Sequence, residues 1–184
     1  MNSKLTRLSN HLSNFDFTII GHRGAAGLAP ENTLSSFNAA CDSGCPFLEL
    51  DVHQLKRVDH ENELIVIHDD TLERTTNVSG RVSDLTEEKL TNIKTVDGRP
   101  LPYLRDVIVL INQRAQIGKR TIGLNIELKG DQTGKLTARY IKKEPKIPIL
   151  ISSFKHQELF EFREIDESTP VAPLFHKWDN ACIE

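Results

Sequence analysis

Short apolar runs alternate with amphipathic stretches along this chain. Apolar or β-branched runs predict six strands, at residues 15–20, 47–53, 63–68, 121–128, 148–154 and 171–175. Apolar positions at helical spacing predict four helices, at residues 33–43, 104–117, 135–143 and 156–164. Gly44 and Gly118 stand where helix C-caps belong. Strands that alternate with helices indicate an α/β protein with a largely parallel sheet.

Two stretches depart from this alternation. Roughly ten polar residues separate the second and third apolar runs, fewer than a parallel crossover usually needs, so a hairpin is expected there. A turn centred near His60 would place His68 opposite Val52 and beside Asp51. Residues 69–102 are polar, with several Thr and Glu and few apolar anchors, which predicts an inserted segment with one short helix at 86–92.

The number of predicted strands indicates the architecture. A complete (β/α)8 barrel has eight strands and typically ~250 residues. The six predicted strands and the 184 residues of this chain fall short of both figures. We therefore expect an α/β fold of the TIM-barrel type that is incomplete, with about six of the eight strands and an insertion after the third strand.

Composition narrows the class of protein and its partners. A hydrophobic content of 38% and a charged content of 27% are ordinary for a globular domain. The net charge of -3 and the lack of a basic stripe argue against a nucleic-acid partner. Three cysteines without paired spacing favour a reducing compartment over a zinc site or a disulfide framework. No apolar stretch approaches the roughly 20 residues of a transmembrane span, and no secretory signal opens the chain, so we expect a cytoplasmic location.

Pairs of charged residues lie inside otherwise apolar strands. Glu49 and Asp51 are two positions apart, as are Glu127 and Lys129, so each pair shares one face of its strand. The apolar neighbours must pack against covering helices. The charged set then points into the barrel mouth, where the active sites of this architecture lie.

Three of these residues are carboxylates that require a cation. Glu49, Asp51 and Glu127 would converge in the barrel, where an unpaired buried charge costs several kcal/mol. All three are hard oxygen ligands, and no cysteine joins them. This ligand set favours Ca²⁺ or Mg²⁺ over zinc.

Four further residues complete the candidate chemistry. Arg23 and Lys129 carry the positive charge that binds a phosphate. His22 and His68, at the ends of the first and third predicted strands, can act as general base and general acid near neutral pH. A metal, a cationic clamp and paired histidines describe phosphoryl-ester cleavage better than acyl transfer. The sequence has neither a Gly-x-Ser-x-Gly elbow nor a Walker loop.

A series of ordered motifs resembles the glycerophosphodiester phosphodiesterase family. The motifs are Gly21-His22-Arg23-Gly24, Pro30-Glu31-Asn32-Thr33, Glu49-Leu50-Asp51-Val52, His68-Asp69-Asp70-Thr71-Leu72 with Arg74-Thr75-Thr76, Asn125-Ile126-Glu127-Leu128-Lys129, and Ser152-Ser153-Phe154. Each short motif is weak evidence by itself, but their order and spacing together are very specific. The resemblance covers the chain from about Ile19 to Phe175.

The resemblance implies a TIM-barrel hydrolase that releases glycerol 3-phosphate and an alcohol from glycerophosphodiesters. The matching residues form an acid–base pair, a phosphate clamp and a divalent-metal site: His22 and His68, Arg23 and Lys129, and Glu49, Asp51 and Glu127. The family carries a small segment after the position of His68 that is expected to cover the glycerol side of the site. Residues 1–184 then form a single domain, with 69–102 as the insertion and the last two strands of the family missing.

Four assignments remain open between a site role and a structural one. Glu31 matches a polar position close to the metal, or it is a first-turn carboxylate favoured by a helix dipole. Asp69 either contacts substrate or orients a loop. His53 shares the face of Glu49 and Asp51, and we favour a structural or rim role over one beside the site. Lys129 either contacts the phosphate or only neutralises Glu127.

Two alternative functions and one partner follow from the same observations. The chain is either an active hydrolase or a catalytically weak, shortened remnant that binds metal or phosphate. A lysophospholipase-D-like member of the same family is the other alternative, although no apolar groove for an acyl chain is evident in the sequence. Open edges of an incomplete barrel predict self-association, beside the small-molecule glycerophosphodiester substrate.

Overall fold

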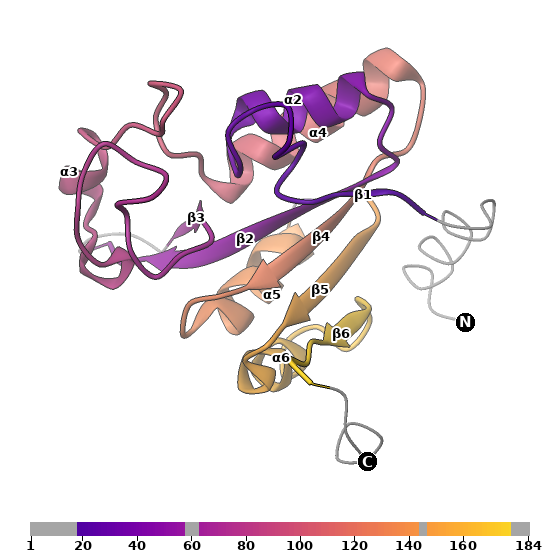
Figure 1. Cartoon of the computed structure of the whole chain (residues 1–184). Coiled ribbons are helices and arrows are strands. Elements are labelled where there is room, and N and C mark those ends of the chain that lie inside the picture. The colour runs from indigo at the N-terminus through magenta and orange to yellow at the C-terminus, as the bar shows by residue number, and fades with distance from the viewer. Residues whose placement is uncertain (1–17, 58–62, 144–146, 178–184) are drawn as a thin grey trace.

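A six-stranded sheet lies at the centre of the protein, whose computed structural model describes residues 18–57, 63–143 and 147–177 (Figure 1). Five strands run parallel in the order β1 (Ile20–Gly21), β2 (Phe47–Leu55), β4 (Gly123–Leu128), β5 (Ile149–Ser153) and β6 (Val171–Pro173). Within the described residues the sheet is open, with β1 and β6 at its edges. The expected α/β fold of an incomplete TIM-type barrel is confirmed, with five parallel strands in this order and the sixth, β3, paired beside β2 outside it.

The first strand is shorter than expected. Within the described part it comprises Ile20–Gly21 alone, whereas the apolar pattern predicted residues 15–20. Positions 15–17 of that prediction lie outside the described residues. The strand pairs with Phe47 and Leu48 of β2, which is enough to bring the loop after β1 beside the middle of β2.

The four expected helices are present, and their ends follow local capping chemistry. They are α2 (Leu34–Asp42), α4 (Leu104–Gly118), α5 (Thr133–Lys143) and α6 (His156–Arg163). The Thr33 hydroxyl caps α2 by accepting a hydrogen bond from the amide of Ser36 at 3.1 Å. No helix in the described part of the chain combines the length and the apolar character needed to cross a bilayer.

The predicted cap at Gly118 is wrong. Helix α4 continues through Gly118, and Lys119 takes the left-handed conformation that ends it, with φ 47°. The amides of Lys119 and Arg120 then donate to the carbonyls of Gln116 and Ala115 at 3.2 and 3.1 Å. A glycine is preferred at such a position but not required, so its place in the sequence predicted the end of the helix one residue early.

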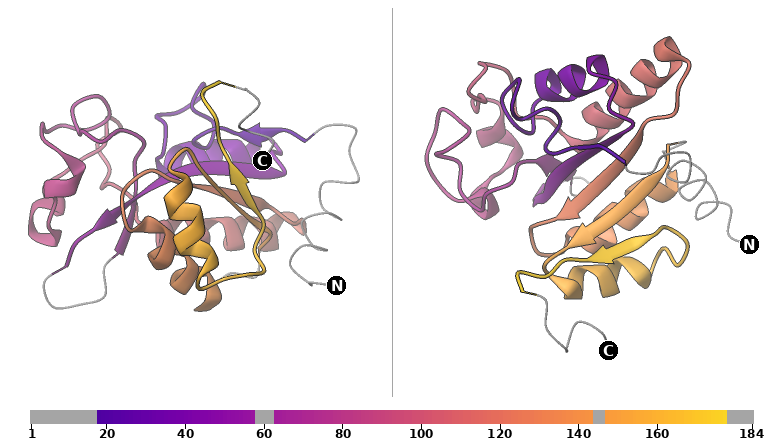
Figure 2. Two further views of the ribbon diagram at one scale, coloured as in Figure 1. Left: turned by 90° about the horizontal axis from the view of Figure 1, so that it is seen from below. Right: turned by 45° about the vertical axis from the view of Figure 1, so that its right-hand side comes forward.

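The main hydrophobic core lies between the sheet and the four helices (Figure 2). Alternate residues of the two central strands are fully buried in it: Leu48, Leu50, Leu124 and Ile126. Burial of each such side chain stabilises the fold by about 1.5–3 kcal/mol. Because side chains alternate along a strand, the intervening carboxylates of β2 and β4 lie on the opposite face of the sheet.

β3 (Glu63–Val66) pairs antiparallel with β2, as the hairpin prediction required, but the predicted register is wrong. Val52 pairs with Val66 and not with His68, a shift of two residues. A shift of two leaves every side chain on the same face, so the hydrophobic pattern cannot distinguish the two registers. His68 consequently lies past the end of β3, two residues beyond Val66.

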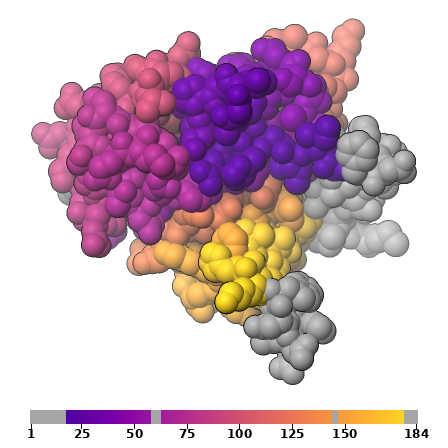
Figure 3. Space-filling view, in the orientation of Figure 1, coloured from indigo at the N-terminus to yellow at the C-terminus, as the bar shows by residue number. Residues whose placement is uncertain are grey.

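The segment of residues 69–102 contains a 3-10 helix (Val82–Asp84) and the short helix α3 (Glu87–Leu90), within the predicted range 86–92. The expectation of few apolar anchors is wrong. Six side chains of the segment are buried: Leu72, Val82, Leu85, Leu90, Ile93 and Leu101. They form a second core with Leu55 of β2, Ile65 of β3 and Ile67, which follows β3. These anchors are spaced irregularly, so no helical or strand period marks them. In Figure 3 the segment (magenta) adjoins the N-terminal region (indigo).

Candidate active site

A tight loop after β1 places the first two candidate residues, His22 and Arg23. Arg23 and Gly24 both have positive φ, at 51° and 82°, and the Gly24 amide lies 3.2 Å from the carbonyls of Gly21 and Glu49. A Cβ on Gly24 would lie 2.0 Å from the Oγ of Ser36, so a larger residue does not fit. The loop therefore packs directly against β2 beside Glu49.

Three carboxylates meet on the face of the sheet opposite the main core. Asp51 of β2 pairs in register with Glu127 of β4, and Glu49 lies two residues before Asp51. Each carboxylate offers one oxygen, and these oxygens all lie within 4.8 Å of one another. Asp51 is 1% exposed, and its Oδ2 accepts a hydrogen bond from Asn32 Nδ2 at 2.9 Å.

Burial and repulsion among the three carboxylates act most clearly on Glu49. Burial, followed by the charge of Asp51, raises the pKa of Glu49 from 4.5 to about 8. Its Oε1 is buried and has no hydrogen-bond partner. A divalent cation would relieve both features, because it compensates the clustered charge and takes up the free oxygen. The donor set of this cluster, carboxylate oxygens without Cys or His, fits a hard cation.

Two cationic side chains border the carboxylates. The Arg23 amide donates to Glu49 Oε2 at 2.7 Å, and Arg23 Nε lies 3.4 Å from Asp51 Oδ2. Lys129 Nζ lies 2.9 Å from Glu127 Oε1 and 3.9 Å from Asp51 Oδ1. Lys129 therefore pairs with Glu127 and also lies near Asp51.

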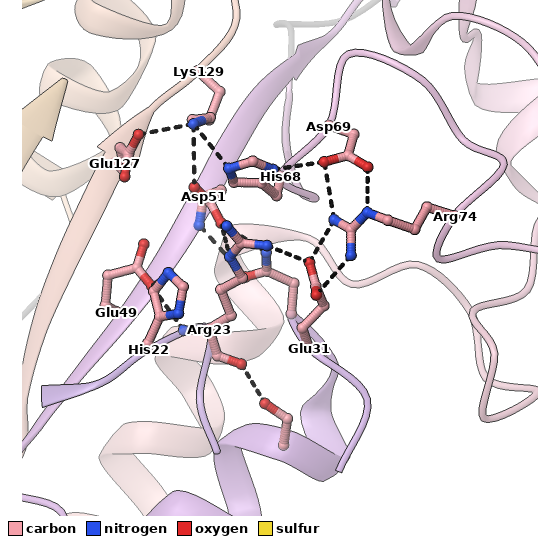
Figure 4. A network of polar contacts seen from close by, with 12 residues as sticks. His22, Arg23, Glu31, Glu49, Asp51, His68, Asp69, Arg74, Glu127 and Lys129 are labelled. Carbon is pink, nitrogen blue, oxygen red and sulfur yellow. Dashed lines mark hydrogen bonds and ion pairs between the residues drawn. The ribbon is translucent and has the colours of Figure 1, made fainter. Parts of the chain in front are cut away.

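The two candidate acid–base histidines have different surroundings (Figure 4). His68 is held on both sides, with Nδ1 2.6 Å from Asp69 Oδ1 and Nε2 3.1 Å from Lys129 Nζ. These partners fit a ring that donates from Nδ1 to Asp69 and accepts at Nε2 from Lys129. The side chain of His22 is 68% exposed, and its Nε2 lies 4.0 Å from Glu49 Oε2. The ring of His68 is therefore oriented by two close partners, whereas that of His22 is largely exposed to solvent.

A layer of charged residues lies behind Arg23 and His68. Arg74 forms hydrogen bonds with both Glu31 and Asp69, and Glu31 also accepts from Arg23 Nη1 at 2.7 Å. The Arg74 guanidinium, assisted by Arg23, lowers the pKa of Glu31 to about 2. Arg74 and then His68 hold the pKa of Asp69 well below its usual range. Both carboxylates are consequently ionised at neutral pH.

His53 lies underneath this layer, buried on the face of Glu49 and Asp51. Its Nε2 is 3.3 Å from the backbone carbonyl of His68, and burial lowers the pKa of His53. A neutral ring that donates to this carbonyl supports the backbone at His68. His53 is buried, and it also borders a cavity of about 530 Å³ that Asp70, Gly130 and Lys155 help to line.

A cavity of about 360 Å³ opens beside the carboxylates, lined by His68, Glu127, Lys129, Phe154 and His176, among others. Phe154 and His176 stack with ring centroids 4.3 Å apart. The volume is at the lower end of the range for small-molecule sites. Of the candidate residues, His68, Asp69, Glu127 and Lys129 therefore border a space that can admit a small substrate.

Sequence reasoning assigned no role to Asn32 or Arg74, although both stand in the motifs it used. Asn32 is buried with φ 55° and holds Asp51, and Arg74 joins two carboxylates. Asn125 and Ser152 also stand in those motifs and were given no role, and Asn125 Oδ1 and Ser152 Oγ are buried without a hydrogen-bond partner. A polar residue inside an apolar strand was the available signal, since Asn125 lies in β4 with Glu127 and Ser152 lies in the neighbouring strand β5.

Comparison with known proteins places the chain in a family. The model of the glycerophosphoryl diester phosphodiesterase family matches residues 22–182. The chain belongs to this family. A glycerophosphodiester phosphodiesterase of Bacillus subtilis is 41% identical over 90% of this chain and 61% of its own length. One of Bacillus altitudinis is 33% identical over 85% of this chain and 65% of its own length.

Solved structures agree with this assignment. A phosphodiesterase of Oleispira antarctica, in complex with the product sn-glycerol-3-phosphate, has a TM-score of 0.69 and 26% identity, over 85% of this chain and 64% of that one. A glycerophosphodiester phosphodiesterase of Agrobacterium tumefaciens has a TM-score of 0.68 and 27% identity, over 84% of this chain and 65% of that one. The chain spans less than two thirds of the length of these relatives.

Proposed function

We propose that this protein is a divalent-metal-dependent phosphodiesterase that hydrolyses glycerophosphodiesters to glycerol 3-phosphate and an alcohol. The observation that supports this most is the convergence of Glu49, Asp51 and Glu127 beside two cations and two histidines. A phosphodiester needs charge stabilisation at its non-bridging oxygens and two proton-transfer groups. The product bound to the Oleispira antarctica enzyme, sn-glycerol-3-phosphate, belongs to the same reaction.

In the proposed reaction the glycerol 2-hydroxyl attacks phosphorus, and the bond from phosphorus to the leaving alcohol breaks. One residue of the pair His22 and His68 takes the hydroxyl proton, and the other protonates the leaving oxygen. Water then opens the cyclic phosphate with the two roles reversed, which gives glycerol 3-phosphate. Arg23 and Lys129 stabilise the charge on the non-bridging oxygens throughout.

Glu49, Asp51 and Glu127 would hold the metal, which we propose is Ca²⁺ or Mg²⁺ because all the donors are hard oxygens. When bound, the cation supplies Lewis-acid stabilisation to the same non-bridging oxygens. Glu49 must then be ionised, because a protonated carboxyl is a poor ligand. Isothermal calorimetry with each cation tests the ligand set, and Asp51→Asn should abolish the binding heat.

The activity is tested by glycerol 3-phosphate release from glycerophosphocholine and glycerophosphoethanolamine, with Ca²⁺, with Mg²⁺ and with chelator. Release that depends on metal and disappears in His22→Ala is expected. If no diester is cleaved while calorimetry still detects metal binding, the chain is the catalytically weak remnant. Faster cleavage of lysophosphatidylcholine than of either diester would instead identify a lysophospholipase-D-like enzyme.

We propose further that residues 1–184 form one domain, with residues 69–102 inserted in it. The second core supports this, because it shares Leu55 and Ile65 with the hairpin. A cytoplasmic location is supported by the free thiols of Cys41 and Cys45. Limited proteolysis and cell fractionation test the two proposals.

Self-association of this 184-residue chain is proposed from the two edges of the described sheet. Ile19 and Ile20 are exposed at the β1 edge, and Phe160 is exposed on α6, next to the β6 edge. Open edges with apolar side chains favour pairing with another chain. A single monomer peak in sedimentation velocity at micromolar protein would contradict this.

A further inference from the structure

Arg74 is bound on both sides of its guanidinium by carboxylates, although its side chain is 47% exposed. Nε and Nη2 lie 2.6 and 2.9 Å from the two oxygens of Asp69. Nη1 lies 2.8 Å from Glu31 Oε2, and Nη2 lies 2.8 Å from Glu31 Oε1. An isolated surface ion pair contributes little, whereas a planar, doubly bidentate arrangement fixes the geometry of all three groups.

Each of these carboxylates also contacts a proposed active-site residue. Glu31 Oε1 accepts from Arg23 Nη1 at 2.7 Å, and Asp69 Oδ1 lies 2.6 Å from His68 Nδ1. Within the described residues Arg74 alone is hydrogen-bonded to both carboxylates. Figure 4 shows the resulting chain from the phosphate-binding candidate on one side to the acid–base candidate on the other.

We propose that Arg74 is a positioning residue for the reaction, which orients His68 through Asp69 and Arg23 through Glu31. The inference rests on the proposed function for its catalytic consequence, but its geometric part does not. Asp69 held in place by Arg74 accepts the Nδ1 proton of His68. That hydrogen bond keeps the proton off Nε2, the nitrogen that faces Lys129 and the cavity.

A simpler role would be to fasten the 69–102 segment to the N-terminal region. The structure offers a matched comparison, because a second hydrogen bond fastens the same segment without contacting the site. Asp97 Oδ2 accepts from the Ser35 hydroxyl of α2 at 2.8 Å. If Arg74 only fastens the segment, Ser35→Ala, which removes this bond, and Arg74→Ala should impair the protein in the same way.

The experiment uses the full chain with Arg74→Ala, Arg74→Lys and Ser35→Ala, each first checked by thermal unfolding. The imidazole ¹⁵N shifts of His68, assigned from His68→Asn, report the Nδ1 proton directly and need no substrate. We expect these shifts to move in Arg74→Ala, to move less in Arg74→Lys, and to stay unchanged in Ser35→Ala. If Arg74→Ala does not fold, the Arg74→Lys spectrum decides.

Turnover supplies the second readout. We expect kcat for glycerophosphoethanolamine to fall on the order of 10- to 100-fold in Arg74→Ala, with a smaller rise in KM. Guanidinium added to the buffer should restore part of kcat in this variant and leave kcat of Ser35→Ala unchanged. Unchanged His68 shifts in both Arg74 variants, or equal losses of kcat in Arg74→Ala and Ser35→Ala, would overturn the inference. A wild-type chain without turnover would count against the proposed function, and the ¹⁵N shifts would still decide the role of Arg74.

Discussion

The two halves of the site hold carboxylates in opposite electrostatic states. On the strands, Glu49 is buried beside Asp51, and its pKa rises to about 8. In the outer layer, Glu31 is paired with Arg74 and Arg23, and its pKa falls to about 2. The first half keeps an unpartnered carboxylate oxygen on Glu49 although Arg23 and Lys129 border it, whereas both carboxylates of the second are paired with Arg74. The same type of side chain is thus a proposed metal ligand in one place and an arginine-paired anion in the other, according to its neighbours.

His68 contacts both halves, and its removal should have the largest effect. We expect His68→Ala to lower kcat by about 10²–10⁴-fold, the usual contribution of one acid–base group. Measured Ca²⁺ affinity should change little, because His68 is not part of the carboxylate cluster. A variant that loses metal affinity and kcat together would mean that the two halves do not act separately.

Core substitutions should show that the main core and the second core, which support the two halves of the site, differ in stability. Leu50→Ala, in the main core, should cost about 2–5 kcal/mol of unfolding free energy and lower the midpoint of the whole chain. Leu90→Ala, in the second core, should open the 69–102 segment locally. Hydrogen exchange measures both effects. Equal loss of protection in β4 for the two variants would contradict separate stability.

The opposite pKa shifts predict opposite pH dependences. Glu31 stabilises the fold above about pH 4.5, and this contribution is lost as the pH falls toward 2. Glu49 has a raised pKa, so the metal-free protein loses stability as the pH rises from about 4.5 to about 8. Added Ca²⁺ should therefore raise Tm more at pH 8 than at pH 5, measured against chelator. Glu49→Gln is the control, and its Tm in chelator should not fall over this range.

The smallest effect is expected at the outer contact between Ser35 and Asp97. Ser35→Ala removes one hydrogen bond at the surface and should cost about 0.5–1.5 kcal/mol. Chemical denaturation measures the cost, and kcat should stay at the wild-type value. A large loss of kcat would show that attachment of the segment, and not the contacts of Arg74, controls the site.

Much of the fold was predictable because it depends on local patterns. The caps of α2, the apolar alternation in β2 and β4, and the pairing of charged residues on one strand face are all encoded within a few residues. The metal-binding candidates could be named for this reason, since Glu49 and Asp51 must share a face. Gly118 shows the limit, because Lys119 adopted the left-handed conformation in its place.

The register of β3 and the second core were not predictable in the same way. A shift of two residues preserves the faces, so Val66 and His68 were equally good partners for Val52. The second core uses anchors such as Leu72 and Ile93, which have no period and meet only when the segment folds back on the hairpin. Neither feature leaves a local signal.

By itself the sequence determined the order of strands and helices, the family, and which residues carry the candidate chemistry, because these follow from short-range periodicity and ordered motifs. Tertiary structure alone decided how the residues are used. Arg74 reaches Glu31 across 43 positions of sequence, and His68 meets Lys129 across 61. Contacts at such separations depend on how the sheet, the loop after β1 and the 69–102 segment pack together. The same packing determines the pKa shifts, because burial and neighbouring charge exist only in the folded chain.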